Sequence, residues 1–272
     1  MINILVTLNA NYIPPLKVML SSLFFNNPEE KFSVYMMYSD ISEEKLQELH
    51  MFFEKNGQCL FPIFVEPMLF ADAPIFRHYT SEMYYRLAAH QFLPNDLDRV
   101  LYLDPDIVVI NTVKSFYESD FENCLFIAAE HKHSTKVASL FNKLRLKTPN
   151  AKGYFNTGVL LMNLEGMRKA VNVKDIYQFI EENRLKLVLP DQDVLNALYW
   201  DKIKPADCYR YNFDARYYEI TKRLPNPKYS LEWIKQNTVF IHYCGKDKPW
   251  MKNYKGELGA FYKQYEKMAA NS

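Results

Sequence analysis

Two aspartates separated by one proline, Asp104-Pro105-Asp106, are the side chains of this sequence best suited to chemistry. They follow an apolar, β-rich run over 99–103 and precede a second run over 107–110, so they stand at the end of a predicted buried strand. In extended backbone the side chains at i and i+2 lie on one face. Two carboxylates on one face suit Mn²⁺ or Mg²⁺, with coordination positions left for phosphate oxygens. An ordinary Asp-Pro turn is the alternative.

Strands and helices alternate in the sequence before this motif. We predict one helix with Pro14 and Pro15 in its first turn, a second after the N-cap Ser42 and a third over 81–92. Strands are predicted over 2–8, 32–38, 60–65 and 99–103. Such alternation favours an α/β fold with a mostly parallel central sheet. Because ligands of these sheets bind at the carboxyl ends of the strands, Asp104 and Asp106 lie where a site is expected.

The order of elements is less regular after Asp106. Apolar runs predict helices over 175–183 and 191–200 and strands over 125–129, 158–163 and 239–241. Residues 205–227 are rich in Tyr, Asn and Pro and predict an irregular lobe. The sequence contains no repeat and no linker. We therefore expect one domain over 1–250, followed by a basic, aromatic C-terminal segment over 251–272.

Polar side chains follow the first predicted strand and precede the Asp104 strand. Asn9 and Asn11 carry amides that can pair with a base edge, and Tyr12 can stack on a base. Capping of the next helix is the alternative for the asparagines. Arg86 stands on the helix that leads to the Asp104 strand and suits a phosphate or carboxylate partner. The alternative for Arg86 is an ion pair on an amphipathic helix.

Two further polar stretches lie beside predicted elements. Asn156-Thr157-Gly158 precedes a strand and combines hydrogen-bonding side chains with a glycine that permits close backbone approach. Asp191-Gln192-Asp193 stands at the start of a helix. Capping accounts for one acidic residue there but not for all three polar residues together.

The last polar stretch follows the strand predicted over 239–241. His242 could complete a metal site begun by the two aspartates, or it could be a structural core histidine. Lys246 and Lys248, which closely follow Gly245, suit a diphosphate.

Taken in order, these stretches resemble glycosyltransferase family 8, retaining sugar-nucleotide enzymes that include bacterial lipopolysaccharide galactosyl- and glucosyltransferases. The resemblance extends from Ile2 to about Trp250. It implies a GT-A-type fold. The motifs that carry it are Leu101-Tyr102-Leu103-Asp104-Pro105-Asp106, Phe155-Asn156-Thr157-Gly158, Asp191-Gln192-Asp193 and His242-Tyr243-Cys244-Gly245.

The resemblance also implies a role for each candidate residue. Asp104, Asp106 and His242 would bind Mn²⁺, with Mg²⁺ as the alternative, and the ion would bridge the diphosphate of UDP. The other implied positions are Asn9, Asn11 and Tyr12 at the uridine, Gly245 and Lys248 at the diphosphate, and Arg86, Glu130, Asn156, Asp191 and Gln192 around the donor sugar.

The implied function is transfer of galactose or glucose from a UDP-sugar to a saccharide or glycolipid acceptor, with retention of anomeric configuration. Asp191 and Gln192 are the implied catalytic residues. A double displacement needs a carboxylate on the β face, and an amide is a poor nucleophile. We therefore favour front-face attack by the acceptor hydroxyl, with the Gln192 carbonyl stabilising positive charge on the sugar.

Two other functions are compatible with parts of the sequence. The run 104–109 also resembles the first motif of haloacid-dehalogenase phosphatases, although about a hundred residues precede it. A non-catalytic module that binds a sugar nucleotide or a glycan is the second alternative. A UDP-sugar turnover assay and a phosphatase assay separate these possibilities.

Composition excludes several common sites. With 7 glycines the chain has no G-x-x-x-x-G-K-[ST] and no G-x-G-x-x-G motif, so a metal would have to hold a bound nucleotide's phosphates. We find no signal-peptide pattern and no apolar run long enough to span a bilayer, and we expect a cytoplasmic protein with no nucleic-acid partner. The cysteines form no C-x-x-C pair and are expected as reduced thiols: Cys59, Cys124, Cys208 and Cys244.

Charge is distributed unevenly along the chain. Residues 1–130 carry 8 basic and 18 acidic side chains, a net charge of −10, whereas residues 131–272 carry 25 and 14, a net charge of +11. Residues 222–272 hold 10 basic and 4 acidic side chains interleaved with Trp and Tyr. This composition suits peripheral contact with an anionic membrane, at the inner face of the cell membrane. A solvated basic face that packs through its aromatic residues is the alternative.

Overall fold

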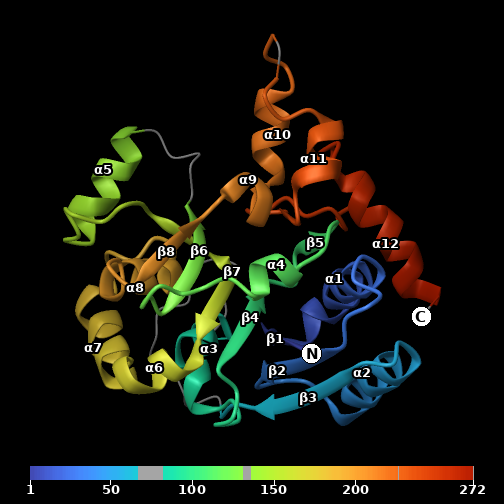
Figure 1. Ribbon diagram of the computed structural model, residues 1–272, viewed down its shortest axis with the longest axis horizontal. Helices are drawn as coiled ribbons and strands as arrows, with labels where there is room; N and C mark the ends of the chain where they lie inside the picture. Colours follow the sequence, from blue (N-terminus) through green and yellow to red (C-terminus); the bar gives the residue numbers. More distant parts are fainter. Residues whose placement is uncertain (67–81, 131–135, 226, 272) are drawn as a thin grey trace.

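The computed structural model describes residues 1–66, 82–130, 136–225 and 227–271, which are built around one large sheet (Figure 1). Within these residues, seven strands form the sheet in the order β3-β2-β1-β4-β7-β6-β8. Their bounds are β1 (Ile2–Thr7), β2 (Phe32–Tyr38), β3 (Cys59–Phe64), β4 (Arg99–Leu103), β6 (Phe126–Glu130), β7 (Phe155–Asn163) and β8 (Ile203–Ala206). Neighbouring strands are parallel except where β7 pairs with β4 and β6. The predicted mostly parallel, mixed sheet is confirmed.

The reversed direction of β7 brings two polar stretches to one edge of the sheet. Because β7 is antiparallel to β4, it begins where β4 ends, and the backbone N–H of Asp104 donates to the carbonyl of Gly158 at 2.8 Å. The strand begins at Phe155, three residues before the predicted start. The polar residues just before Gly158 therefore belong to the strand itself.

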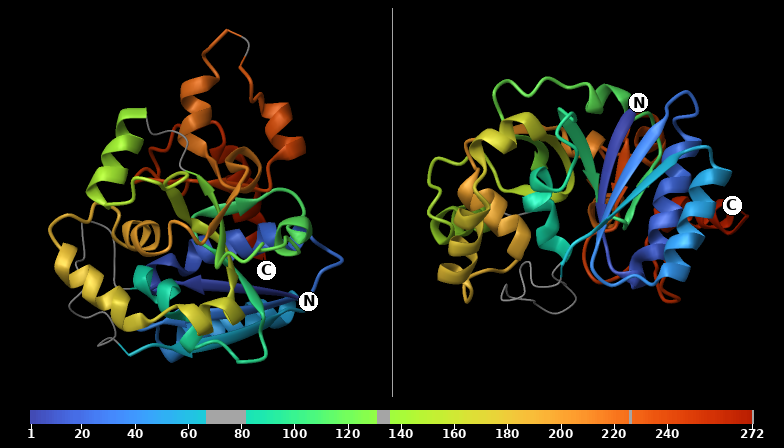
Figure 2. Two further views of the ribbon diagram at one scale, coloured as in Figure 1. Left: turned by 60° about the vertical axis from the view of Figure 1, so that its left-hand side comes forward. Right: turned by 90° about the horizontal axis from the view of Figure 1, so that it is seen from below.

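Helices cover both faces of the sheet (Figure 2). As predicted, Pro14 and Pro15 lie in the first turn of α1, and Ser42 caps α2 by accepting from the N–H of Lys45. The helix predicted over 81–92 is shorter, because the 3₁₀ turn η2 (Ala89–Gln91) ends it, and Ser81 lies outside the described residues. One face packs α1 (Ile13–Phe25), α2 (Glu43–Lys55) and α4 (Lys114–Tyr117), and the other packs α3 (Glu82–Ala88), α6 (Leu164–Ala170), α7 (Val173–Asn183) and α8 (Pro190–Leu198).

A second, smaller sheet carries the residues that follow β4. In the described part of the chain it consists of β5 (Ile107–Val109), β10 (Phe240–His242) and β9 (Phe213–Asp214), with β10 in the centre. The helices α9 (Cys208–Tyr211) and α10 (Ala215–Thr221) flank β9. The prediction of an irregular lobe over 205–227 is therefore wrong. These elements are too short to produce a periodic pattern, and β9 is held in place by its pairing with β10.

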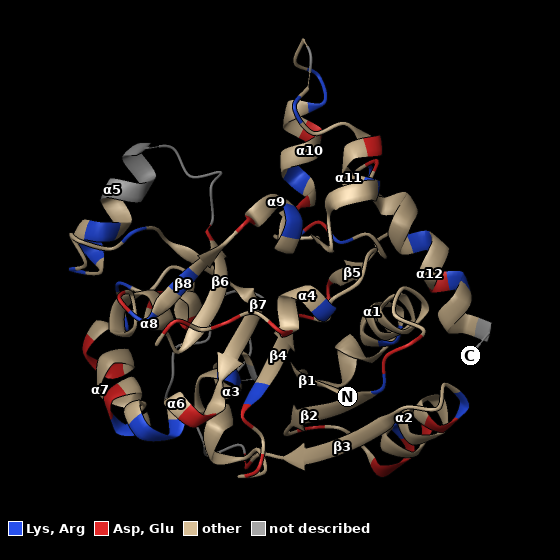
Figure 3. Ribbon diagram, viewed as in Figure 1, with Lys and Arg blue, Asp and Glu red and all other residues tan. Residues whose placement is uncertain are grey.

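The C-terminal segment packs against the rest of the protein. The helix α12 (Gly259–Asn271) lies on α1, and with α11 (Leu231–Asn237) it encloses a third core that includes Tyr262 and Tyr265. The Tyr265 hydroxyl accepts a hydrogen bond from Asn26 Nδ2 at 2.8 Å. These aromatic rings face inward, as the packing alternative states, whereas the lysines of the segment are exposed. Figure 3 marks in blue where Lys and Arg stand along α12. None of the helices in the described residues combines the length and apolarity needed to cross a lipid bilayer.

Tyr262 tests how firmly this segment is packed. Its ring lies 6.0 Å from that of Tyr243 and 5.6 Å from that of Trp250, measured between centroids. We expect Tyr262→Ala to lower the free energy of unfolding by about 3–5 kcal/mol, because a large buried side chain leaves a cavity. Lys267→Ala, at an exposed position of the same helix, should change it by less than about 0.5 kcal/mol. Urea unfolding followed by tryptophan fluorescence measures both, and two equally small effects would contradict the packing.

Candidate active site

A cavity of about 270 Å³ opens at the edge of the sheet where β4 ends and β7 begins. Most of the predicted site residues line it, although they come from separate parts of the sequence. Asn11, Glu130 and Lys246 are candidates that do not. Those that do are Asn9, Tyr12, Arg86, Asp104, Asp106, Asn156, Asp191, Gln192, His242, Gly245 and Lys248.

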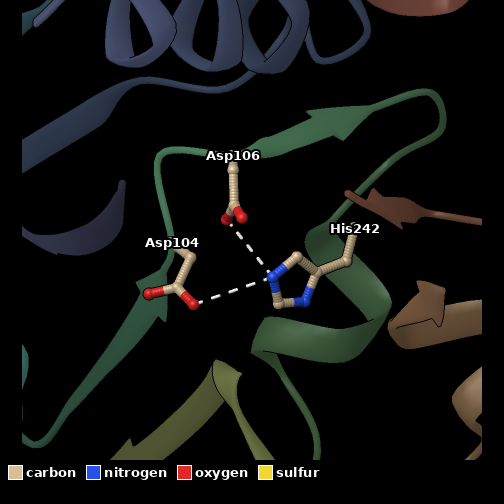
Figure 4. Close-up of side chains that lie close together, drawn as sticks. All are labelled: Asp104, Asp106 and His242. Carbon is tan, nitrogen blue, oxygen red and sulfur yellow. Dashed lines mark ion pairs between the residues drawn. The ribbon is translucent and has the colours of Figure 1, made fainter. Parts of the chain in front are cut away.

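Asp104, Asp106 and His242 form a compact cluster on the wall of this cavity (Figure 4). One ligand atom of each residue lies within 4.8 Å of the others. His242 Nε2 is 3.2 Å from Oδ1 of Asp106 and 3.7 Å from Oδ2 of Asp104. Two carboxylates and one imidazole are a donor set that suits Mn²⁺ and also accommodates Mg²⁺. The residues present therefore fit the expected divalent ion.

Two buried cations compensate the charge of the carboxylates. Arg86 Nη1 lies 3.0 Å from Asp104 Oδ1, and Lys248 forms an ion pair with Asp106. Burial alone would raise the pKa of Asp106, but Lys248 and His242 beside it hold that pKa well below its usual value. Asp106 is therefore ionised and ready to accept a cation.

The His242 ring is held in a defined orientation. Burial acts to lower its pKa, but Cys244 and Asp106 raise it, so that the pKa lies well above the usual value of a histidine. Nδ1 lies 2.9 Å from Oδ1 of Asn212 and donates to it, because a carbonyl oxygen can only accept. Nε2 faces the aspartates. A divalent ion would bind Nε2 in its deprotonated form.

Gly158 leaves the space that this cluster occupies. A Cβ atom at this position would lie 2.3 Å from Cε1 of His242 and 2.6 Å from Oδ2 of Asp104. Real Cβ atoms essentially never approach other heavy atoms so closely. The glycine predicted to permit a close approach therefore makes room for side chains of the cluster.

Asp191 and Gln192 reach the cavity from the start of α8. Asp191 Oδ2 accepts a hydrogen bond from Thr157 Oγ1 at 2.8 Å and lies 3.4 Å from Arg86 Nη1. Burial raises the pKa of Asp191, although Arg86 acts to lower it. Gln192 Oε1 accepts from Asn156 Nδ2 at 3.1 Å. These contacts hold both side chains beside the metal-ligand cluster.

Asp193 has a structural role instead. It is fully buried, and its carboxylate accepts from both terminal nitrogens of Arg145, at 2.6 and 2.7 Å. It also accepts from the Tyr154 hydroxyl at 2.6 Å and from the backbone N–H groups of Val188 and Leu189. The third polar residue of the Asp-Gln-Asp motif therefore anchors the turn before α8.

The residues predicted for the base have different surroundings. Asn9 Oδ1 accepts from the backbone N–H of Asn11 at 3.0 Å, so Asn9 caps the 3₁₀ turn η1 (Ala10–Tyr12), as the capping alternative states. Asn11 is exposed. Tyr12 lines the cavity, and its ring meets that of Trp250 edge-on, with centroids 6.2 Å apart. Of the three, Tyr12 is the residue best placed to stack on a base.

Three other residues differ from expectation. Glu130 lies at the end of β6, outside the cavity lining, and its carboxyl group occupies the space that a Cβ of Gly153 would take. Its place at the sugar stays a prediction. Asn212 and Arg216 contact the site but were not predicted. Arg216 lines the cavity and is held by Asp214, with Nη2 2.6 Å from Oδ2. Both missed residues lie in the region predicted to be irregular, where no motif marked them.

The sequence matches Glycosyl transferase family 8 over residues 3–254. The chain belongs to this family. The lipopolysaccharide 1,2-glucosyltransferase of Escherichia coli is 26% identical over 253 residues, which cover 89% of this chain and 71% of that protein. The lipopolysaccharide 1,3-galactosyltransferase of Salmonella typhimurium is 24% identical over 261 residues, which cover 91% and 72%.

The solved structures agree with this family 8 assignment. The galactosyltransferase LgtC, solved in complex with donor and acceptor sugar analogues, is 25% identical, with a TM-score of 0.84 over 98% of this chain and 96% of that one. The predicted GT-A-type fold is confirmed. Family membership and fold leave the interpretation of 104–109 as a phosphatase motif without support.

Gly158→Ala tests the packing of the ligand cluster. The added methyl group would push apart His242 and Asp104, so we expect Mn²⁺ affinity to fall at least about tenfold, the loss typical of disturbed ligand orientation. Gly57→Ala is the control. Gly57 has a φ of 63°, and its Cβ would meet no atom closer than 3.6 Å, so this variant should lose stability while it keeps its Mn²⁺ affinity. Calorimetric titration with Mn²⁺ measures both, and equal affinities would contradict the close approach.

Proposed function

We propose that this protein is a retaining, metal-dependent hexosyltransferase that moves galactose or glucose from a UDP-sugar to a saccharide or glycolipid acceptor. The observation that carries the proposal is the cluster of Asp104, Asp106 and His242 on a cavity wall in a family 8 chain. Relatives named for glucosyl and galactosyl transfer to lipopolysaccharide support a hexose donor. We place the enzyme in the cytoplasm, with its acceptor at the inner face of the membrane.

The diphosphate would bind between the cluster and Lys248. When Mn²⁺ or Mg²⁺ is bound, it supplies Lewis-acid stabilisation of the departing UDP. Lys248 donates to Asp106 and, at 2.9 Å, to the carbonyl of Tyr243, which leaves a third ammonium hydrogen for a phosphate oxygen. Gly245 lines the same wall with a φ of 88°, a conformation that suits glycine and lets its backbone approach the phosphates.

The donor sugar would lie between Arg86, Asp191 and Gln192. Arg86 Nη1 forms ion pairs with both Asp104 and Asp191. Arg86 therefore connects a candidate metal ligand with a residue on the sugar side of the cavity. Asp191 can accept from a sugar hydroxyl, and the Gln192 carbonyl dipole can stabilise positive charge at the anomeric carbon. Asp193 is engaged by Arg145 and lies outside the cavity lining. This arrangement favours front-face attack by the acceptor hydroxyl over a carboxylate nucleophile at Asp193.

A turnover assay tests the proposal against a non-catalytic binding module. Hydrolysis of UDP-glucose and UDP-galactose should be detectable with Mn²⁺ present, and the faster of the two identifies the donor. NMR of the product should show the anomeric configuration of the donor. Binding of UDP-sugar with no turnover in the presence of saccharide acceptors would favour the binding module.

UDP affinity should depend on the metal. Without a divalent ion the carboxylates of Asp104 and Asp106 repel a diphosphate, so calorimetry should show UDP binding at least about tenfold weaker in EDTA than in Mn²⁺. Asp104→Asn and Asp106→Asn should each abolish turnover while the far-ultraviolet circular dichroism stays unchanged. Equal UDP affinity in EDTA and in Mn²⁺ would refute the metal bridge.

Gln192→Ala should separate catalysis from donor binding. Because the proposed contact strengthens only in the transition state, we expect kcat to fall at least about a hundredfold, while the Kd of UDP in Mn²⁺ changes less than about threefold. Steady-state kinetics and calorimetry give the two values. A trapped glycosyl adduct on a carboxylate of this region would instead establish a double displacement.

A further inference from the structure

A continuous line of side-chain hydrogen bonds joins His242 to Gln192. His242 Nδ1 donates to Asn212 Oδ1 at 2.9 Å, and Asn212 Nδ2 donates to Asn156 Oδ1 at 2.7 Å. Asn156 Nδ2 then donates to Gln192 Oε1 at 3.1 Å. The line therefore connects a candidate metal ligand with the side chain proposed to act on the sugar.

One backbone group sets the direction of the whole line. The N–H of Gly158 donates to Asn156 Oδ1 at 2.9 Å, and a backbone N–H can only donate. Asn156 must therefore turn its nitrogen to Gln192, which presents its oxygen. Asn212 must likewise turn its nitrogen to Asn156 and its oxygen to His242. It follows that the proton of His242 stays on Nδ1, and that Nε2 is the atom available to a metal.

The four residues come from four separate segments and are shielded from water. His242 ends β10, Asn212 lies between α9 and β9, Asn156 is the second residue of β7, and Gln192 is in the first turn of α8. His242, Asn212 and Gln192 are buried, and Asn156 is partly buried. Hydrogen bonds in such surroundings are stronger than in water, and a donor left unpaired there is costly. Each amide is therefore held in one orientation.

We propose that Asn212 is a positioning residue that couples the metal-ligand cluster to the sugar side of the site. It fixes the His242 ring so that Nε2 faces the aspartates, as hydrogen-bond partners of metal-bound histidines do. Through Asn156 it also fixes the Gln192 amide. Asn156 occupies one of the two lone pairs of Gln192 Oε1, so the other stays available to the sugar. The part that concerns Gln192 rests on the proposed function, whereas the part that concerns His242 does not.

Substitution of Asn212 or Asn156 by Asp or Ala can remove individual hydrogen bonds of this line. Asn212→Asp keeps an acceptor for His242 but removes the donor to Asn156. Asn212→Ala removes both. Asn156→Asp keeps an acceptor for Gly158 and Asn212 but removes the donor to Gln192.

We expect a different result from each variant. Calorimetry with Mn²⁺ alone should show at least about tenfold weaker binding for Asn212→Ala, and a change below about threefold for Asn212→Asp and Asn156→Asp. The kcat for a UDP-sugar in saturating Mn²⁺ should fall at least about tenfold in all three, because the Gln192 amide is no longer held. Asn237→Ala, which removes an amide from the end of α11, away from the cavity lining, should leave both values unchanged.

Two results would overturn the proposal. One is unchanged Mn²⁺ affinity and kcat in Asn212→Ala. The other is unchanged Mn²⁺ affinity and unchanged kcat in Asn212→Asp, because Asp is nearly isosteric with Asn and this is the result expected if Asn212 only fills space. If the wild-type protein binds Mn²⁺ but turns over no UDP-sugar, the proposed function fails, and the Mn²⁺ titrations alone then decide whether Asn212 positions His242.

Discussion

The close approach of β7 to the end of β4 at Gly158 is the constraint on which the rest of the site depends. The carbonyl of Gly158 accepts from Asp104, its N–H donates to Asn156, and its missing Cβ leaves the space that His242 occupies. Since β7 runs against β4, its start and the end of β4 share one edge of the sheet. A parallel strand would bring its own carboxyl end there, and the polar residues before Gly158 would lie at the opposite edge.

Two carboxylates lie together at the same edge of the sheet. Burial would make their ionised forms unfavourable if no cations lay beside them. Asp104 and Asp106 each have a cationic partner, Arg86 and Lys248, and both cations are buried. Removing one member of such a pair costs about 3–5 kcal/mol, because it leaves a buried charge uncompensated, although the pair itself adds little stability. The pairs therefore contribute mainly to geometry: they hold two carboxylates side by side before any ion arrives.

The sequence predicted those parts of the molecule that local patterns determine. Three features depend on neighbouring residues and are present as predicted: the strand that ends at Leu103, the two prolines in the first turn of α1, and the Ser42 cap of α2. Asn212 was missed because its position depends on β9, which forms through pairing with β10 and leaves almost no local signal. Glu130 was placed at the sugar by resemblance alone, and the bulge between β6 and β7 at that point is a long-range feature.

The C-terminal segment shows why composition could not choose between membrane contact and packing. Basic and aromatic residues are interleaved in both cases, so their proportions carry no information about which side is buried. The spacing of the aromatic residues is informative: Leu258, just before α12, and Tyr262 and Tyr265 within it recur at intervals of four and three, which places them on one side of the helix. This side faces the core, and Lys263 and Lys267 lie on the exposed side. Any attraction of this helix to an anionic surface would therefore rest on its lysines, without inserted rings, and would be screened strongly by salt.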